Sequence, residues 1–92
     1  MMNNSLAQII QRKDENIVVT NLGNEMVMMN LESGNYITLN NLGSIIWEKI
    51  KEPIKVSDLI NYLLSKYKVT ESQCKEETFI FLEKLKAEGL ID

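Results

Sequence analysis

The chain contains 92 residues, of which 45% are hydrophobic and 25% are charged, with one proline and four glycines. These values fit a single ordinary globular domain and exclude a second domain, a disordered chain and a collagen-like repeat. Ten lysines and arginines against thirteen aspartates and glutamates give a net charge of −3. Because a small domain that binds a phosphate backbone usually has a basic excess, a nucleic-acid partner is not favoured.

Histidine is absent from the sequence, and Cys74 is its single cysteine. The chain therefore lacks the commonest general base and metal ligand, and it can form no internal disulfide. A domain of this size also has little interior volume for a deep enzyme pocket. We expect no catalytic residue, no metal site and no cofactor, and we interpret Cys74 as a small buried hydrophobic residue.

The N-terminal segment MMNNSLAQ has no basic start and no cleavage-site pattern. The apolar runs of the chain are far shorter than the roughly 20 residues that span a bilayer. A lone cysteine is also typical of a reducing compartment. We therefore expect a cytoplasmic protein without a membrane partner.

Extended, β-branched segments dominate the first half of the chain. Residues 1–16 are polar and weakly patterned, and we treat them as an arm of uncertain structure before a single domain at residues 17–92. Strands are expected at residues 17–20, about 25–31 and 35–39. Gly23-Asn24 suits a primed hairpin turn, and Glu32-Ser33-Gly34 supplies a second turn with a glycine available for positive φ. Together they predict a three-stranded antiparallel meander.

Apolar residues recur at helical spacing in the second half of the chain. Helices are expected after residue 40 to about residue 50, at about 56–67 and at about 70–88. Asn40 is a good N-cap for the first helix, and Thr70 with Gln73 forms a capping-box pattern at the start of the third. Gly89 is the residue expected just past the end of the third helix.

The third predicted helix carries an apolar stripe that is expected to face the core. Its members lie within roughly 60° of Thr78 on a helical wheel: Cys74, Phe81, Leu82 and Leu85. Ile80 falls on the opposite side, among glutamates. It is either a singly exposed apolar residue, which we favour, or a contact with another molecule.

The inventory of strands and helices predicts an α+β fold, a winged helix-turn-helix-like domain, although here a three-stranded antiparallel sheet precedes the three helices. The usual partner of that fold is DNA, so a small winged-helix transcriptional regulator is the main alternative function. However, a recognition helix needs basic or amide side chains, and the third helix has five glutamates, three lysines and no arginine. Sequence-specific DNA binding is therefore disfavoured.

The third strand, residues 35–39, is an edge of the predicted meander. It carries no proline and no charge that would discourage pairing with another strand. Two interpretations stay open from the residues alone: the N-terminal arm covers this edge, or the edge accepts an extended peptide as an added strand. A third function, an interaction domain whose edge pairs with a second copy of the chain, is also retained.

The run from Ser33 to Trp47, SGNYITLNNLGSIIW, resembles the S-G-x-Y-x-x-L-N-x-x-G-x-x-I-W signature of the PqqD-like family. Members of this family are small peptide-recognition domains of ribosomal natural-product pathways, also called RiPP recognition elements. The resemblance covers about residues 17–91. It implies a three-stranded sheet followed by three helices and a non-catalytic role, in which the domain binds the leader segment of a precursor peptide and presents it to maturation enzymes.

In that family the leader lies antiparallel along the third strand, in a cleft against the third helix. The resemblance therefore implies peptide-binding positions on the second strand, the third strand and the third helix: Val27, Met29, Asn35, Tyr36, Ile37, Thr38, Leu39, Cys74, Thr78, Phe81 and Leu85. The form of the signature resembles that of free-standing proteins in lasso-peptide clusters more than that of the pyrroloquinoline-quinone pathway member. This implies as partners a lasso precursor leader, a separate leader-cleaving cysteine protease and a macrolactam-forming cyclase.

Overall fold

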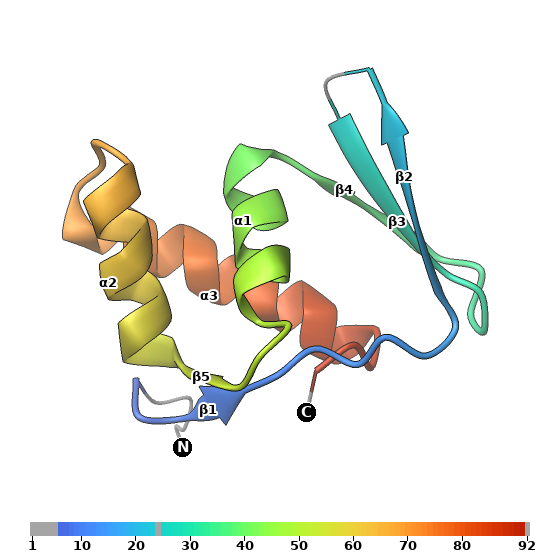
Figure 1. Ribbon diagram of the computed structural model, residues 1–92, viewed down its shortest axis with the longest axis horizontal. Helices are drawn as coiled ribbons and strands as arrows, with labels where there is room; N and C mark the ends of the chain where they lie inside the picture. The colour runs from blue at the N-terminus through green and yellow to red at the C-terminus, as the bar shows by residue number, and fades with distance from the viewer. Residues whose placement is uncertain (1–5, 24, 92) are drawn as a thin grey trace.

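The computed structural model describes residues 6–23 and 25–91. Within these residues the chain forms a three-stranded sheet that lies beside three helices, and a two-stranded ribbon at the lower edge of the helices (Figure 1). The predicted α+β fold, with the sheet first and the helices after it, is confirmed. None of the helices in this part of the chain is long and apolar enough to cross a membrane.

The main sheet is an antiparallel meander in the order β2-β3-β4. Its strands are β2 (Ile17–Leu22), β3 (Glu25–Asn30) and β4 (Tyr36–Leu39). β2 ends two residues later than predicted, and β3 and β4 are each one residue shorter. Gly23 and Gly34 have φ values of +66° and +81°, so both turn glycines adopt the left-handed backbone that their turns require. Asn24 of the first predicted turn lies outside the described residues.

The two faces of this sheet differ in burial. Met28 and Leu39 point toward the helices and are each 1% exposed. Val18, Met29 and Tyr36 are aligned across the three strands on the outer face, where Tyr36 is 67% exposed. The sheet therefore gives one face to the core and leaves the other in solvent.

Three helices follow the sheet: α1 (Asn41–Lys49), α2 (Val56–Lys66) and α3 (Glu71–Ala87). Both predicted N-caps are present. Asn40 Oδ1 accepts from the Gly43 N–H at 2.8 Å, and Thr70 Oγ1 accepts from the Gln73 N–H at 3.1 Å. The Gln73 side chain donates to Glu77, so the cap of α3 is only half of the predicted capping box.

The core lies where the helices meet the inner face of the sheet. Its largest fully buried side chains come from both layers: Met28, Leu39, Ile46, Ile50, Leu59, Leu63, Leu85, Val56, Thr78 and Cys74. Trp47 is 3% exposed and also belongs to this core. The burial of Cys74 likewise agrees with a small hydrophobic role.

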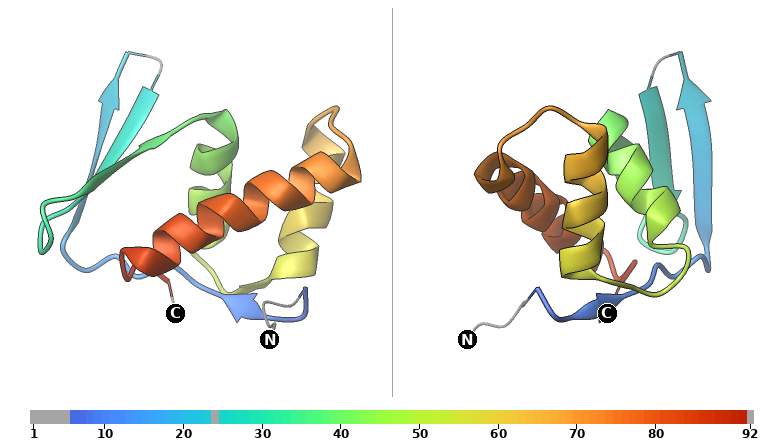
Figure 2. Two further views of the ribbon diagram at one scale, coloured as in Figure 1. Left: turned by 180° about the vertical axis from the view of Figure 1, so that it is seen from behind. Right: turned by 60° about the vertical axis from the view of Figure 1, so that its left-hand side comes forward.

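Residues 6–16, expected as an arm of uncertain structure, pack against the helical layer. β1 (Ile9–Ile10) pairs antiparallel with β5 (Ile54–Lys55), the strand that directly precedes α2, and the two strands form the ribbon. Ile10 is 5% exposed and belongs to the core. Figure 2 shows that this segment passes under the helices and not along β4. No described segment pairs with the outer edge of β4, so for these residues the interpretation of an arm-covered edge is wrong.

Arg12 fastens this segment to α1. Its guanidinium carbon lies 4.8 Å from the centroid of the Trp47 ring, and Nη1 donates to the Trp47 carbonyl at 2.9 Å. The same side chain forms an ion pair with Asp14, with 2.8 Å between Nε and Oδ1. The N-terminal segment is therefore held in place by strand pairing, apolar burial and a stacked cation together.

Candidate functional site

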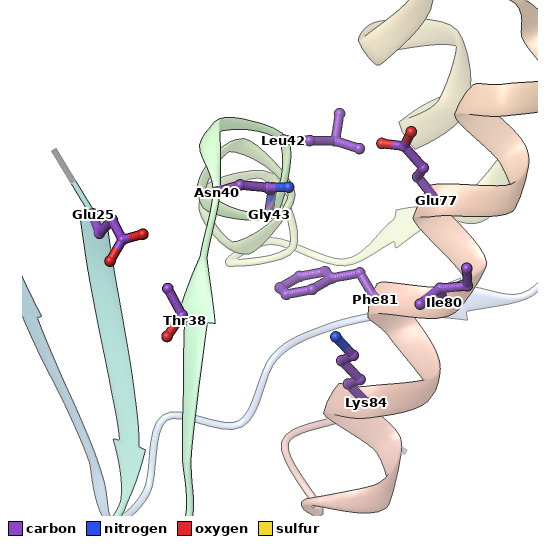
Figure 3. A pocket seen from close by; sticks show the side chains of 9 residues that line it. All are labelled: Glu25, Thr38, Asn40, Leu42, Gly43, Glu77, Ile80, Phe81 and Lys84. Atoms are coloured by element: carbon purple, nitrogen blue, oxygen red, sulfur yellow. The ribbon is translucent and has the colours of Figure 1, made fainter.

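A cleft of about 420 Å³ lies between the outer edge of β4 and α3, with the first turn of α1 at one end (Figure 3). We call it the β4–α3 cleft. Its lining comes from β3, β4, α1 and α3 and from the residue before α1: Glu25, Thr38, Asn40, Leu42, Gly43, Glu77, Ile80, Phe81 and Lys84. In Figure 3 the Phe81 ring points from α3 toward β4, between Glu77 and Lys84. The exposed strand edge thus faces a wall of mixed apolar and charged side chains.

The hydrogen bonds at the end of the sheet show which residues of β3 bond to which neighbour. The Asn30 N–H donates to the Asn35 carbonyl, and the Leu31 N–H donates to the Asn16 carbonyl, both at 2.8 Å. These opposed residues continue the registers of β3 with β4 and with β2. In antiparallel strands, hydrogen-bonded pairs alternate with non-hydrogen-bonded pairs. Even-numbered residues of β3 therefore bond to β4, and odd-numbered residues bond to β2.

This alternation determines what the outer edge of β4 offers. Ile37 and Leu39 are opposite even-numbered residues of β3, so their N–H and C=O groups point inward and complete the ladder. The N–H and C=O groups of Tyr36 and Thr38 point away from β3, toward the open edge. The four residues of β4 therefore alternate between bonding to β3 and facing the open edge.

Gly43 allows α1 and α3 to approach closely at one end of the cleft. A Cβ atom at residue 43 would lie 3.2 Å from Phe81 Cε1 and 3.3 Å from Asn40 Oδ1. Asn40 is at the same time the N-cap of α1, and the preceding Leu39 is buried in the core. The L-N-x-x-G part of the signature therefore anchors β4, starts α1 and leaves room for the Phe81 ring.

The other end of the cleft is tied to the end of α3 by the β3–β4 turn. Ser33 Oγ donates to Glu88 Oε1 at 3.1 Å, and Asn35 Nδ2 donates to Glu88 Oε2 at 2.9 Å. Asn30 Nδ2 donates to the Glu88 carbonyl at 3.1 Å, while its Oδ1 accepts from the N–H groups of Glu32 and Ser33. The S-G-N segment of the signature thus holds the start of β4 against the C-terminus of α3.

A second hollow of about 290 Å³ continues the cleft beyond the end of β4. It lies between the start of α1, the α2–α3 connection and the first half of α3, and its lining is Asn40, Asn41, Leu42, Tyr67, Val69, Gln73, Cys74 and Glu77. Asn40, Leu42 and Glu77 line both spaces. The two hollows therefore form one groove that extends past the strand edge.

Five of the expected peptide-binding residues lie in or beside this groove. Thr38 and Phe81 line the β4–α3 cleft, and Cys74 lines the second hollow although it is only 2% exposed. Tyr36 contributes outward backbone groups to the edge. Asn35 is bound to Glu88 where the cleft ends.

The other expected residues support the groove or lie on a different face. Four have side chains in the core or packed against it: Ile37, Leu39, Thr78 and Leu85. Thr78 and Leu85 are each 0% exposed, so their side chains back the wall and do not reach the cleft. Val27 and Met29 are opposite Thr38 and Tyr36 in the register and share the outer face of the sheet with them.

The residues of α3 that sequence analysis did not place in the site share one sector of the helix: Gln73, Glu77, Ile80 and Lys84. At 100° per residue this sector lies beside the core stripe, and Phe81 stands at the border between the two. Ile80, interpreted as a singly exposed residue, is 52% exposed and lines the cleft. The signal available in the sequence was an apolar residue, Ile80, placed between the opposite charges of Glu77 and Lys84.

The fold and the groove define a small α+β domain with an open strand edge that faces a helix, and the described residues contain no group of side chains suited to a metal ion. The family model described as coenzyme PQQ synthesis protein D (PqqD) matches residues 25–91. The chain belongs to the PqqD family, which confirms the resemblance seen in the signature.

Comparison with individual proteins supports the same fold. No curated protein sequence matches the chain. The structure of TbiB1 in complex with the TbiA(beta) leader peptide is similar with a TM-score of 0.72 and 22% identity, over 89% of this chain and 94% of that chain. Lasso peptide synthetase B1 complexed with the leader peptide is similar with a TM-score of 0.73 and 22% identity, over 90% of this chain and 96% of that chain.

Proposed function

We propose that this chain is a non-catalytic adaptor that binds the leader segment of a ribosomally made precursor peptide by strand addition to β4. The observation that carries the proposal is the outer edge of β4, where Tyr36 and Thr38 direct unpaired backbone groups toward the groove. An extended peptide at this edge pairs with those groups and places alternate side chains against Phe81 and Leu42. Membership of the PqqD family supports this function, as do two similar structures that are both leader-peptide complexes.

The peptide runs antiparallel to β4, as the family resemblance implies. It enters beside Asn40, passes the Phe81 ring and leaves near Lys84. The N–H and C=O groups of Tyr36 and Thr38 provide at most four hydrogen bonds, each worth about 0.5–1.5 kcal/mol. Because backbone bonds are the same for every peptide sequence, the side chains that line the groove must provide the selectivity.

We place the adaptor in lasso-peptide biosynthesis in the cytoplasm. The form of the Ser33–Trp47 signature and the similarity to lasso peptide synthetase B1 support this pathway. In this role the adaptor presents the precursor to two separate proteins, a leader-cleaving cysteine protease and a macrolactam-forming cyclase. The absence of histidine and the burial of Cys74 agree with protease chemistry on another chain.

Titration with the leader of a precursor encoded beside this gene tests the proposal. The fluorescence anisotropy of a labelled leader should rise saturably on addition of the parent protein. Thr38→Pro removes one outward donor and places a ring at the edge, so we expect about tenfold weaker binding with thermal stability near that of the parent. Equal leader affinity in parent and variant would contradict strand addition to β4.

A salt titration separates this proposal from the DNA-binding alternative. Binding driven by phosphate contacts weakens steeply as salt is added, whereas strand addition with apolar contacts changes little. We expect leader affinity to fall far less steeply with salt than phosphate-driven binding does. Duplex DNA should bind this chain no more tightly than it binds an acidic control protein. Tight, salt-sensitive binding to a duplex would instead support a regulator.

A further inference from the structure

The β4–α3 cleft carries opposite charges toward its two ends. Glu25, which follows the register opposite Asn40, and Glu77 line the end where β4 leads into α1, and Lys84 lies on the far side of Phe81 (Figure 3). Seven positions separate Glu77 from Lys84, a distance of about 10 Å along the helix axis. Along α3 the wall is therefore acidic, then apolar, then basic.

These charges are available to a ligand. Among the residues that the structure describes, neither Glu25 nor Lys84 forms an ion pair, and Glu77 accepts a hydrogen bond from Gln73 Nε2 at 3.1 Å. The nearest carboxylate further along α3, that of Glu88, already accepts two hydrogen bonds from the β3–β4 turn. Lys84 therefore lines the open cleft, and no carboxylate of the described residues forms an ion pair with its ammonium group.

The direction of a bound strand determines which part of a peptide meets which charge. The bond between Asn35, just before β4, and Glu88, just after α3, shows that α3 runs opposite to β4. A peptide antiparallel to β4 therefore runs in the same direction as α3. Its N-terminal part passes Glu25 and Glu77, and its C-terminal part passes Lys84. Charge complementarity then favours a basic residue first and an acidic residue later.

Strand geometry also determines the spacing of those residues. A strand advances about 3.3 Å per residue, and side chains at i, i+2 and i+4 share one face. Four residues span about 13 Å, which the long side chains on both partners can reconcile with the roughly 10 Å between the two charged positions of α3. The residue between them then lies against Ile80 and Phe81.

Resting on the proposed function, we infer that Glu77 and Lys84 select leaders that contain the order basic-x-apolar-x-acidic from N- to C-terminus. These two side chains discriminate between added strands by the order of their charged residues. Neither residue touches the backbone bonds of the added strand, so the inference can fail while strand addition holds.

Selection from a displayed library of random peptides of about 12 residues, long enough to span the groove, tests the inference without a known leader. The full chain is immobilised at low ionic strength, and peptides retained by the parent but not by Thr38→Pro are scored as cleft-dependent. We expect the basic-x-apolar-x-acidic order to be enriched about three- to tenfold over the reversed order, the range that two exposed ion pairs supply.

A charge-inverted variant provides the decisive comparison. Glu77→Lys combined with Lys84→Glu keeps the net charge and should enrich the reversed order, acidic-x-apolar-x-basic. The matched control is Glu83→Lys combined with Lys86→Glu, because these residues line a different hollow of α3. It should retain the parent's preference. Thermal unfolding of all proteins establishes that each variant is folded.

The outcomes distinguish a failure of the charge-order inference from a failure of the proposed function. Cleft-dependent peptides that show no charge order, or the same order with the inverted variant, would overturn the inference and leave strand addition intact. If no recovered peptide distinguishes the parent from Thr38→Pro, the proposed function is contradicted and the inference falls with it.

Discussion

The main sheet has two edges, and only one of them forms a candidate site. β2 is the longer edge strand, with six residues against four in β4, and neither strand contains a charge or a proline. By the alternation along β3, Val19 directs its N–H outward just as Thr38 does. β2, however, contributes no residue to the β4–α3 cleft or to the second hollow, whereas α3 and α1 face β4.

An open edge is therefore not by itself a binding site. Free backbone groups accept any extended chain, and they are as available on β2 as on β4. Side chains such as Phe81 and Leu42 are what turn the edge of β4 into a groove of limited width and mixed polarity. The proposed binding of a leader at β4 therefore predicts that changes in the two edges have different effects.

The largest effect is expected from proline at an inward position of β4. Ile37→Pro deletes a donor to β3 within a half-buried strand, so its cost should be comparable to the roughly 3 kcal/mol that proline costs inside a helix. Thermal and urea unfolding should show a large loss of stability for Ile37→Pro and little for the control, Thr38→Pro. Equal stabilities would show that the assignment of inward and outward groups is wrong.

The second effect compares a buried residue that supports the α3 wall, Leu85, with a residue that lines the cleft, Phe81. Leu85→Ala should lower the free energy of unfolding by about 2–5 kcal/mol, because the side chain is 0% exposed, and leave leader affinity of the folded protein nearly unchanged. Phe81→Ala should lose less stability but weaken leader binding about tenfold, through the lost apolar contact. Urea unfolding measures the stability of both variants, and calorimetric titration of the folded variants measures their leader affinity. Unchanged affinity of the Phe81 variant would remove this ring from the site.

The third effect compares the two edges directly. Val19→Pro and Thr38→Pro each remove one outward donor from an edge strand, and both should remain folded. We expect leader affinity to fall about tenfold for Thr38→Pro, the value of a lost hydrogen bond with a steric obstacle, and to be unchanged for Val19→Pro. A similar loss in both variants would mean that the leader does not choose between the edges.

The smallest effect is expected at the α1 end of the cleft. In Gly43→Ala the new Cβ would lie 3.2 Å from Phe81 Cε1, so the ring must shift by a few tenths of an ångström. Alanine also favours a helix over glycine by up to about 1 kcal/mol, so stability should stay level or rise while leader affinity falls about two- to fivefold. Ser44→Ala, on the same turn, is the control. Higher stability with unaltered affinity would show that the position of the ring does not matter.

Much of the fold could be predicted because its signals are local. Period-two runs and glycine turns located the meander, and helical spacing with Asn40 and Thr70 as caps located the helices. The uncharged third strand allowed an open edge but did not exclude an edge covered by the N-terminal arm. Each of these features depends on residues that are close together in the sequence.

The remaining features depend on contacts between distant segments. β1 and β5 have two residues each, too few for any periodic pattern, so their pairing and the burial of Ile10 were not foreseen. The inward or outward direction of each β4 residue follows from the geometry of the turn at Gly34, which composition does not specify. On α3, a helical wheel separates apolar from polar residues, but it does not show that Ile80 and Lys84 face a strand edge.

β4 is fastened to the helices at both ends, by Glu88 at its start and by the Asn40 cap at its end. The width of the cleft is therefore established before any peptide arrives, and the loss of conformational entropy on binding falls almost entirely on the peptide. Under these conditions different leaders should associate at similar rates and differ mainly in how fast they dissociate. Under the proposed function, the dissociation rate of each leader then determines how long its precursor remains available to the next enzyme.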